Sequence, residues 1–268
     1  SFKDNTGITR LRFADPTKSN TTFITTIVMS AFKGCSNIPD LIMSDTARTS
    51  EYQVLSGNDG LSVLNTIIEV DIFAFEGCSG FRGDLRIPES ITKIESATFG
   101  RCQFDGRLIL HDGIKSIGDI NGSEPVFGRF SGELVLPKEI TYIQDDCFKG
   151  CGFSSIASLP ETIQTIGANA FGDCRNLRGV IEIPEGVVRI ESGAFGSCNN
   201  LEGIILPTSL TVIEGGAFKN CVMLNKIVCK SIEPPLLLDG SFDNAPSFFN
   251  SSGIPFLFKS DDIHDMLF

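Results

Sequence analysis

Nine cysteines are the residues of this 268-residue chain with the most evident chemical potential. Most of them follow a phenylalanine by three positions and recur at repeat-length intervals, which are far longer than the Cys-x-x-Cys spacing of zinc sites. In stacked repeats, equivalent cysteines would lie roughly 4.8 Å apart, farther than the ~3.8 Å between the Cβ atoms of a disulfide. We therefore predict no metal site and a column of buried free thiols. A disulfide between Cys147 and Cys151 is the alternative.

Histidines and carboxylates, the usual acid–base residues, are not arranged for catalysis. His111 ends an expected strand, where other repeats carry proline, and His264 lies near the C-terminus. Neither has a nearby serine, cysteine or carboxylate pattern typical of a catalytic triad. We predict no catalytic residue, no cofactor and no metal, and carboxylate catalysis is the less favoured alternative. Residues 56–60 resemble a calcium loop only faintly and lack its Asp/Asn series.

The composition restricts the partners that the chain can bind. Its formal net charge is −11, so phosphate backbones and acidic lipid surfaces are repelled. No apolar run approaches the roughly 20 residues of a membrane-spanning helix. We expect neither nucleic-acid binding nor membrane insertion of this segment, and we expect a monomer. Because the chain begins with Ser1 rather than methionine, we expect a trimmed or mature product.

A phenylalanine that follows a small residue marks an internal repeat. The chain has 22 phenylalanines, two tyrosines and no tryptophan, which indicates one position filled repeatedly by the same side chain. Most intervals between these phenylalanines are close to 23 or 24 residues, with longer ones in the first half. The positions are Phe2, Phe32, Phe75, Phe99, Phe127, Phe148, Phe171, Phe195, Phe218 and Phe242.

Each repeat predicts two short strands and a turn. In Ile181-Glu182-Ile183-Pro184, two apolar residues flank a variable one, which is typical of a half-buried strand that proline ends. The same pattern assigns a strand to Ala157-Ser158-Leu159, with Ala157 in the core. An apolar pair three residues apart, such as Val187 and Ile190, predicts the second strand. The Ala-Phe-x-x-Cys segment closes the repeat as a tight turn.

One repeat cannot bury its apolar side alone, so successive repeats must stack. The expected fold is a repeat solenoid, mainly β: a right-handed coil of short parallel strands with tight turns and one continuous core. A two-sheet sandwich is the alternative. It is disfavoured because the register holds over consecutive repeats.

The pattern resembles the BspA-like (Treponema pallidum-type) leucine-rich repeat. That family's unit runs roughly Leu-x-x-Ile-x-Ile-Pro-x-x-Val-x-x-Ile-Gly-x-x-Ala-Phe-x-x-Cys, and residues 81–229 match it almost unit by unit. The glycines before the strands, such as Gly106 and Gly132, also fit. The resemblance implies a leucine-rich-repeat fold and roles in surface adhesion and recognition, in bacteria and some protists.

The positions of the repeats and the breaks between them predict the domain organisation. We expect one solenoid of about nine repeats over residues 1–229, with insertions at 15–22, 44–61 and 119–125. Residues 230–268 would form a C-terminal cap of the same domain. An edge strand at 254–258 and a short helix that begins at Ser260 would cover the open end of the coil.

The outward residues of the first strands are the expected partner-binding surface. Several are β-branched, and a row of exposed apolar residues suits protein contact, although strands favour such residues in any case. The candidate residues are Arg86, Arg107, Ile109, Glu133, Val135, Ser158, Glu182, Ile205 and Val228.

We therefore predict a non-catalytic, secreted or cell-surface protein that binds a protein, such as a host or extracellular-matrix protein, or a glycan. The alternative is a structural spacer within a larger surface protein. An enzyme would require clustered carboxylates in a cleft.

Overall fold

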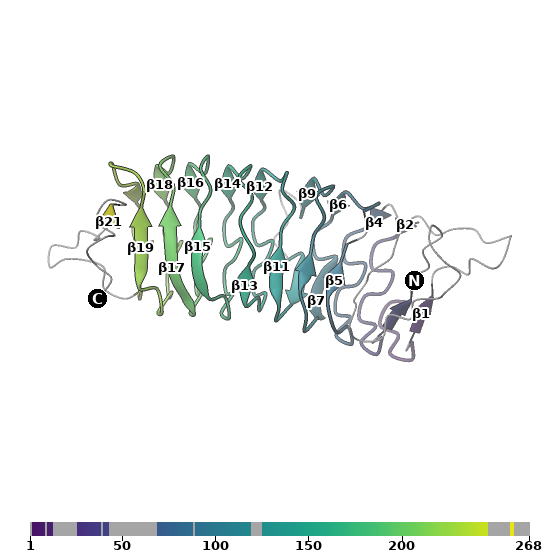
Figure 1. Cartoon of the computed structure of the whole chain (residues 1–268). Coiled ribbons are helices and arrows are strands. Elements are labelled where there is room, and N and C mark those ends of the chain that lie inside the picture. The colour runs from purple at the N-terminus through teal and green to yellow at the C-terminus, as the bar shows by residue number, and fades with distance from the viewer. Residues whose placement is uncertain are drawn as a thin grey trace. The chain divides into compact units, whose positions relative to one another are not determined.

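The structure is a computed structural model, and it describes residues 2–8, 10–12, 26–38, 40–42, 69–87, 89–118, 125–245 and 258–259 (Figure 1). The chain divides into two compact units, Ser1–Glu139 and Ile140–Phe268. Each unit is an array of short strands that pair in parallel between successive repeats. This arrangement confirms a β-solenoid without helices in the described residues.

In the first unit, the first strands of the repeats pair in parallel with equivalent residues in register. Arg10 pairs with Asp40, and Leu85 pairs with Leu108. These strands are β1 (Arg10–Arg12), β3 (Asp40–Ile42), β5 (Leu85–Arg86), β8 (Leu108–Ile109) and β11 (Glu133–Val135).

The second strands of the same repeats also pair in parallel, β2 with β4 and β6 with β9. Each ends on a buried apolar residue, as the apolar pair of the repeat predicts. Their bounds are β2 (Thr26–Ile27), β4 (Glu69–Val70), β6 (Lys93–Ile94) and β9 (Ser116–Ile117).

Two of the expected tight turns are strands instead. β7 (Phe99–Gln103) and β10 (Phe127–Arg129) pair in parallel, with a register irregularity after Phe127. A Cβ atom at Gly128 would overlap the carbonyl oxygen of Cys102, so glycine permits this close backbone approach.

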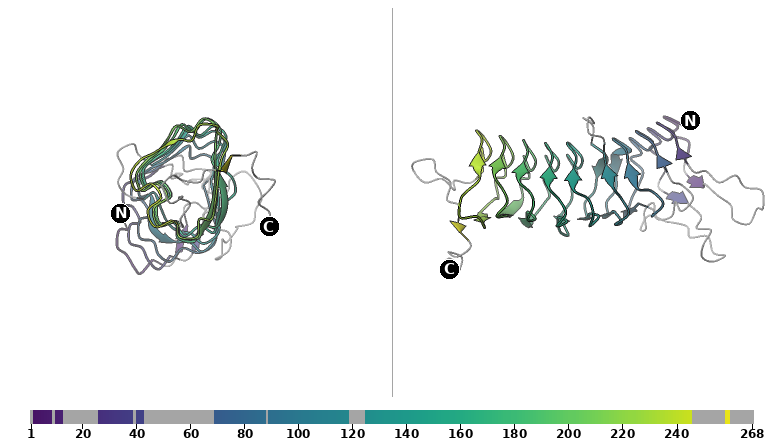
Figure 2. Two further views of the ribbon diagram at one scale, coloured as in Figure 1. Left: turned by 90° about the vertical axis from the view of Figure 1, so that its left-hand side faces the viewer. Right: turned by 90° about the horizontal axis from the view of Figure 1, so that it is seen from above.

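The second unit repeats the two-strand pattern, and its coils lie over one another in the end-on view of Figure 2. The first strands are β13 (Ser155–Ile156), β15 (Gly179–Glu182), β17 (Leu201–Leu206), β19 (Lys226–Cys229) and β21 (Phe258–Lys259). The second strands are β12 (Tyr142–Ile143), β14 (Thr165–Ile166), β16 (Arg189–Ile190), β18 (Val212–Ile213) and β20 (Leu236–Leu237).

The repeated phenylalanines stack face to face, which confirms that one position is filled by the same side chain. In the second unit, consecutive ring centroids are 5.0 to 5.4 Å apart, in the order Phe148, Phe171, Phe195, Phe218 and Phe242. In the first unit, they are 5.5 to 6.0 Å apart, in the order Phe2, Phe32, Phe75, Phe99 and Phe127.

Backbone hydrogen bonds close the Ala-Phe-x-x-Cys turn. The amide of Phe195 donates to the carbonyl of Ala217 in the next repeat at 2.8 Å, and the amide of Cys198 donates to the carbonyl of Phe195 at 3.2 Å. Ser197 has a φ of 59°, the left-handed conformation that such a turn requires. The expected turn is therefore confirmed here.

Several expected features lie outside the described residues. They are the insertions at 15–22 and 44–61, the insertion at 119–125 except for Pro125, the helix from Ser260 and His264. Of the expected edge strand, only Phe258 is described, as the first residue of β21. The domain boundary expected at residue 229 stays a prediction.

Candidate partner-binding site

In the first unit, the outward residues form one row across the sheet. Arg86 is opposite Ile109, and Ile109 is opposite Val135. Their neighbours Leu85, Leu108 and Leu134 are fully buried, so alternation along each strand turns the row away from the core. Arg86 is exposed, whereas Ile109 and Val135 are half-buried. The row thus offers two aliphatic side chains beside a guanidinium.

A charged row runs parallel to it. Nε and Nη2 of Arg107 lie 3.1 and 2.7 Å from Oδ2 of Asp84, and the Arg107 amide donates to Oδ1 at 2.8 Å. Partial burial opposes ionisation of Asp84, but these bonds outweigh it and lower the pKa of Asp84. The bond to Asp84, with a further contribution from the charge of Glu133, raises the pKa of Arg107. Arg107 is thus held by its neighbouring repeat.

In the second unit, Glu182, Ile205 and Val228 are opposite one another on β15, β17 and β19. Glu182 is exposed and Ile205 is half-buried. Val228 is only 5% exposed, so it is buried although it shares the register of Ile205 and Glu182. Val228 pairs with Phe258, because β21 adds a further strand beside β19. Val228 therefore does not belong to an accessible surface.

The strand expected at Ala157-Ser158-Leu159 is displaced towards the N-terminus. The observed strand, β13, is Ser155–Ile156, and Ala157 is exposed rather than buried. Leu159 is buried as expected, and Ser158 is exposed. Alanine offers little apolar area where other repeats carry isoleucine or leucine, so its burial stabilises the strand less. The prediction that Ala157 lies in the core is therefore wrong.

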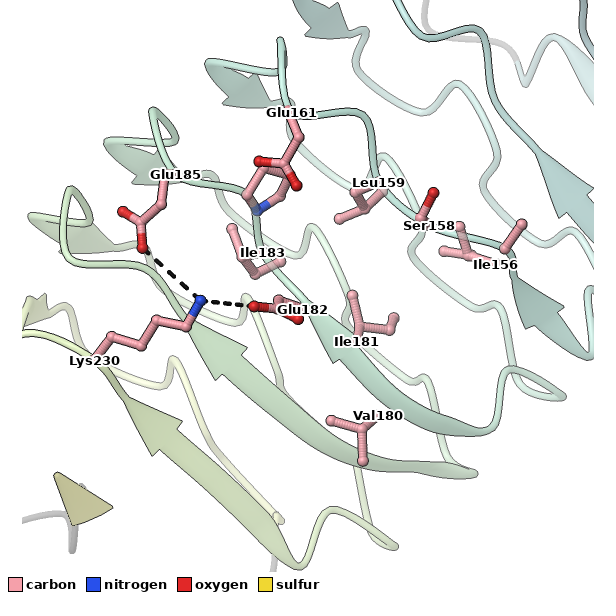
Figure 3. A pocket seen from close by; sticks show the side chains of 12 residues that line it. Ile156, Ser158, Leu159, Glu161, Val180, Ile181, Glu182, Ile183, Glu185 and Lys230 are labelled. Carbon is pink, nitrogen blue, oxygen red and sulfur yellow. Dashed lines mark hydrogen bonds and ion pairs between the residues drawn. The ribbon is translucent and has the colours of Figure 1, made fainter. Parts of the chain in front are cut away.

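The strand ladder of the second unit begins at β15 and runs through β17, β19 and β21, without β13. The amide of Arg178 still donates to the carbonyl of Ser154 at 3.1 Å. Beyond that bond, a groove of about 350 Å³ lies between the two repeats (Figure 3). It is lined by Ile156, Ala157, Ser158, Leu159, Glu161, Val180, Ile181, Glu182, Ile183, Pro184, Glu185 and Lys230.

Three carboxylates and one ammonium surround this groove. Nζ of Lys230 lies 2.6 Å from Oε1 of Glu182 and 3.9 Å from Oε1 of Glu185. The hydrogen bond to Glu182 raises the pKa of Lys230, and the charge of Glu161 contributes. Desolvation opposes ionisation of Glu185, but hydrogen bonds from Thr208 outweigh it and lower the pKa of Glu185. The groove therefore carries a net charge of −2 at neutral pH.

Of the candidate residues, Ser158 and Glu182 meet in this groove, and the pattern of strand residues did not predict Glu161, Glu185 or Lys230 there. The sequence feature that could have indicated the groove is Ala157, a small residue at a position that is isoleucine or leucine in the other repeats.

All nine cysteines are buried free thiols, as expected, Cys147 and Cys151 included. The thiol of Cys198 donates to the carbonyl of Phe171 in the preceding repeat at 3.2 Å, an interaction that the sequence pattern did not predict. Burial raises the pKa of Cys198 well above its usual value and that of Cys78 to about 12. These thiols are therefore structural rather than nucleophilic.

His111 follows β8, at the turn position expected for it. The amide of Gly113 donates to Nδ1 of His111 at 3.1 Å, which leaves Nε2 to donate to the carbonyl of Ile91 at 3.0 Å. Both ring nitrogens are thus occupied by the backbone.

Within the described ranges, no three His, Cys, Asp or Glu side chains are grouped as metal ligands. The same part of the chain contains no helix with the length and hydrophobicity that crossing a membrane requires.

Short parallel strands, a stacked aromatic core and outward variable residues define a leucine-rich-repeat solenoid. The model of the BspA-type leucine-rich repeat region matches residues 58–120 and 130–244 with six copies. The chain therefore belongs to the BspA-type leucine-rich repeat family. Such repeats typically bind proteins and are generally non-catalytic.

Several solved bacterial structures are similar to this chain. A leucine-rich repeat protein from Bacteroides ovatus is 24% identical over 88% of this chain and 49% of its own, with a TM-score of 0.55. The T. pallidum leucine-rich repeat protein is 19% identical over 81% of this chain and 78% of its own, with a TM-score of 0.47.

A leucine-rich cell surface protein from Faecalibacterium prausnitzii is 18% identical over 85% of this chain and 63% of its own, with a TM-score of 0.38. The chain thus spans about half the length of the Bacteroides ovatus protein and less than two thirds of the Faecalibacterium protein. A comparison with curated proteins found no match.

Proposed function

We propose that this chain is a non-catalytic recognition module of the cell surface or extracellular space, which binds a partner protein through the outward residues of its first strands. The observation that carries the proposal is the row of partly exposed β-branched residues, held in register by the strands beneath. Membership of a repeat family that typically binds proteins supports it.

The row has the properties of a contact surface. Ile109 and Val135 are opposite each other in the first unit, and Ile205 is beside Glu182 in the second. The three aliphatic residues are half-buried, so they present apolar area with less side-chain conformational entropy to lose on binding than fully exposed residues. Arg86 and Glu182 supply exposed charges, which suit an interface with an apolar centre and a polar rim.

A panel of purified extracellular-matrix and host-surface proteins, with a glycan array beside it, tests the proposal. The triple variant Ile109→Lys, Val135→Lys, Ile205→Lys is expected to weaken a captured protein partner at least tenfold, because buried charge at an interface costs about 1.4 kcal/mol or more. Surface plasmon resonance measures the affinity.

The matched control places three lysines on exposed residues of the other side of the repeats, at Thr92, Thr141 and Val188. It carries the same added charge and should bind as the unaltered protein does. Equal binding by both triple variants would show that the contact lies outside the first strands. Binding to glycans but to no protein would show that the partner is a glycan.

A further inference from the structure

The groove between β13 and β15 differs from the rest of the second unit. From β15 to β21, parallel pairing joins each first strand to the next, but the described residues of β13 do not pair with β15. The second strands of the same repeats remain paired, with Thr165 of β14 opposite Arg189 of β16. The opening is therefore confined to one side of the coil, where the outward residues lie.

Aliphatic side chains line part of the groove, although more of its exposed surface is polar than apolar. Ile156 contributes one side, and Val180 and Ile181 contribute the other (Figure 3). Ala157, which follows Ile156 in the chain, also lines the groove. Val180 is 48% exposed, and Ile181 retains some exposure although its counterpart Ile204 has none. At about 350 Å³, the volume is within the range of small-ligand pockets, roughly 300–1,000 Å³. The groove is thus large enough for one long side chain.

The rim is acidic, and it already holds a cation from this chain. Glu182 and Glu185 share the ammonium group of Lys230, and Glu161 projects from the opposite repeat (Figure 3). Lys230 neutralises only part of the negative charge of the rim, because three carboxylates face one ammonium group. A groove that combines aliphatic side chains with an acidic rim matches a side chain with an aliphatic stem and a cationic head.

We infer that the groove between β13 and β15 is a binding pocket for an arginine or lysine side chain of a partner protein, with Lys230 as the internal cation that the partner displaces or joins. This inference rests on the proposed function and names a specific contact within it. The stem would lie along Ile156 and Val180, and the head would contact Glu161, Glu182 or Glu185.

Peptide titrations followed by NMR test the pocket directly. The probe is the blocked peptide acetyl-Gly-Arg-Gly-amide, compared with its lysine and uncharged glutamine counterparts. The cationic peptides should shift the backbone amides of residues 156–159 and 180–185 saturably, with a dissociation constant on the order of 1 mM. The glutamine peptide should leave these amides unchanged. The affinity for the cationic peptides should fall when the salt concentration is raised, because salt screens the rim charges.

Three variants separate the parts of the argument. Lys230→Met removes the internal cation and should tighten binding by roughly two- to fivefold. Glu182→Gln should weaken it by a similar factor. Ala157→Phe keeps every charge but fills the groove, and should abolish the shifts. Matched controls outside the groove are Lys226→Met and Glu202→Gln, which should bind as the unaltered protein does.

The inference is overturned if the glutamine peptide produces the same shifts, if the arginine peptide produces none in this groove, or if Ala157→Phe binds unchanged. The titration uses no partner protein, so it fails or succeeds separately from the strand-face experiment. If the peptides do not bind but the triple lysine variant still weakens binding of the partner protein, the pocket is excluded and the proposed function is retained.

Discussion

Nζ of Lys230 lies 2.6 Å from Oε1 of Glu182, which precedes it by 48 residues in the chain. The ion pair spans two repeats and joins the chain beyond β19 to β15. It also connects the groove to the stability of the C-terminal repeats, because the same ammonium neutralises part of the rim charge and bridges the coils.

The Lys230–Glu182 pair is therefore expected to stabilise the second unit only slightly. Both side chains are substantially exposed, and exposed ion pairs contribute about 0.2–1 kcal/mol. Lys230→Met should lower the free energy of unfolding by that amount, as measured by urea titration at low salt. Lys226→Met on β19 is the control for removal of a lysine. A loss above about 2 kcal/mol would show that Lys230 has a packing role as well.

The phenylalanine column should respond strongly to truncation at its centre. Phe195 is fully buried, with ring centroids 5.2 and 5.4 Å from those of Phe171 and Phe218. Phe195→Ala should cost about 3–5 kcal/mol through lost burial and a residual cavity. Phe2 is 52% exposed and stacks on Phe32 alone among the described rings, so Phe2→Ala should cost about 1 kcal/mol or less. Equal losses in chemical denaturation would contradict this account of the core.

The cysteines should be inert in the native protein. Cys174, Cys198 and Cys221 are fully buried, and their raised pKa values keep them protonated at neutral pH. An aromatic disulfide reagent at pH 8 should therefore label these thiols only after unfolding, whereas all nine should react in denaturant. Labelling is read by absorbance and located by mass spectrometry. Prompt native labelling of Cys198 would mean that the column opens locally.

The Asp84–Arg107 pair should make the stability of the first unit depend on pH. The folded-state pKa of Asp84 is lowered from its ordinary value of 3.8, so its stabilisation is present above that value and is lost as pH falls through the folded-state pKa. Asp84→Asn should cost about 1 kcal/mol at pH 7, after allowance for the exposure of Arg107.

In urea titrations, the difference between Asp84→Asn and the unaltered protein should shrink as pH falls below 3.8 and disappear once the pH is below the folded-state pKa of Asp84. Glu89→Gln, an exposed residue of the same unit, controls for the loss of one negative charge. A difference that stays constant as pH is lowered from 7 to 2 would assign the effect of Asp84 to its neutral hydrogen bonds.

The repeat pattern alone predicted the class of fold and most of the core. Ile181, Ile183, Val187, Ile190, Phe195 and Cys198 are all buried, in the positions expected of them. This succeeds because inward and outward positions alternate locally along each strand, so the side-chain pattern encodes them directly. The same local rule failed at Ala157, and it did not predict the burial of Val228, because the exposure of both residues depends on neighbouring coils.

The sequence by itself thus determined the solenoid, the stacked phenylalanines and the buried thiols, because each depends on a residue type recurring at one interval. The tertiary structure alone decided where the ladder opens between β13 and β15, and it alone brought Lys230 to Glu182. Both features arise from contacts between residues that are one or two repeats apart. Whether such contacts form depends on how whole coils stack, and the repeat pattern, although it marks Ala157 as atypical, does not specify that stacking.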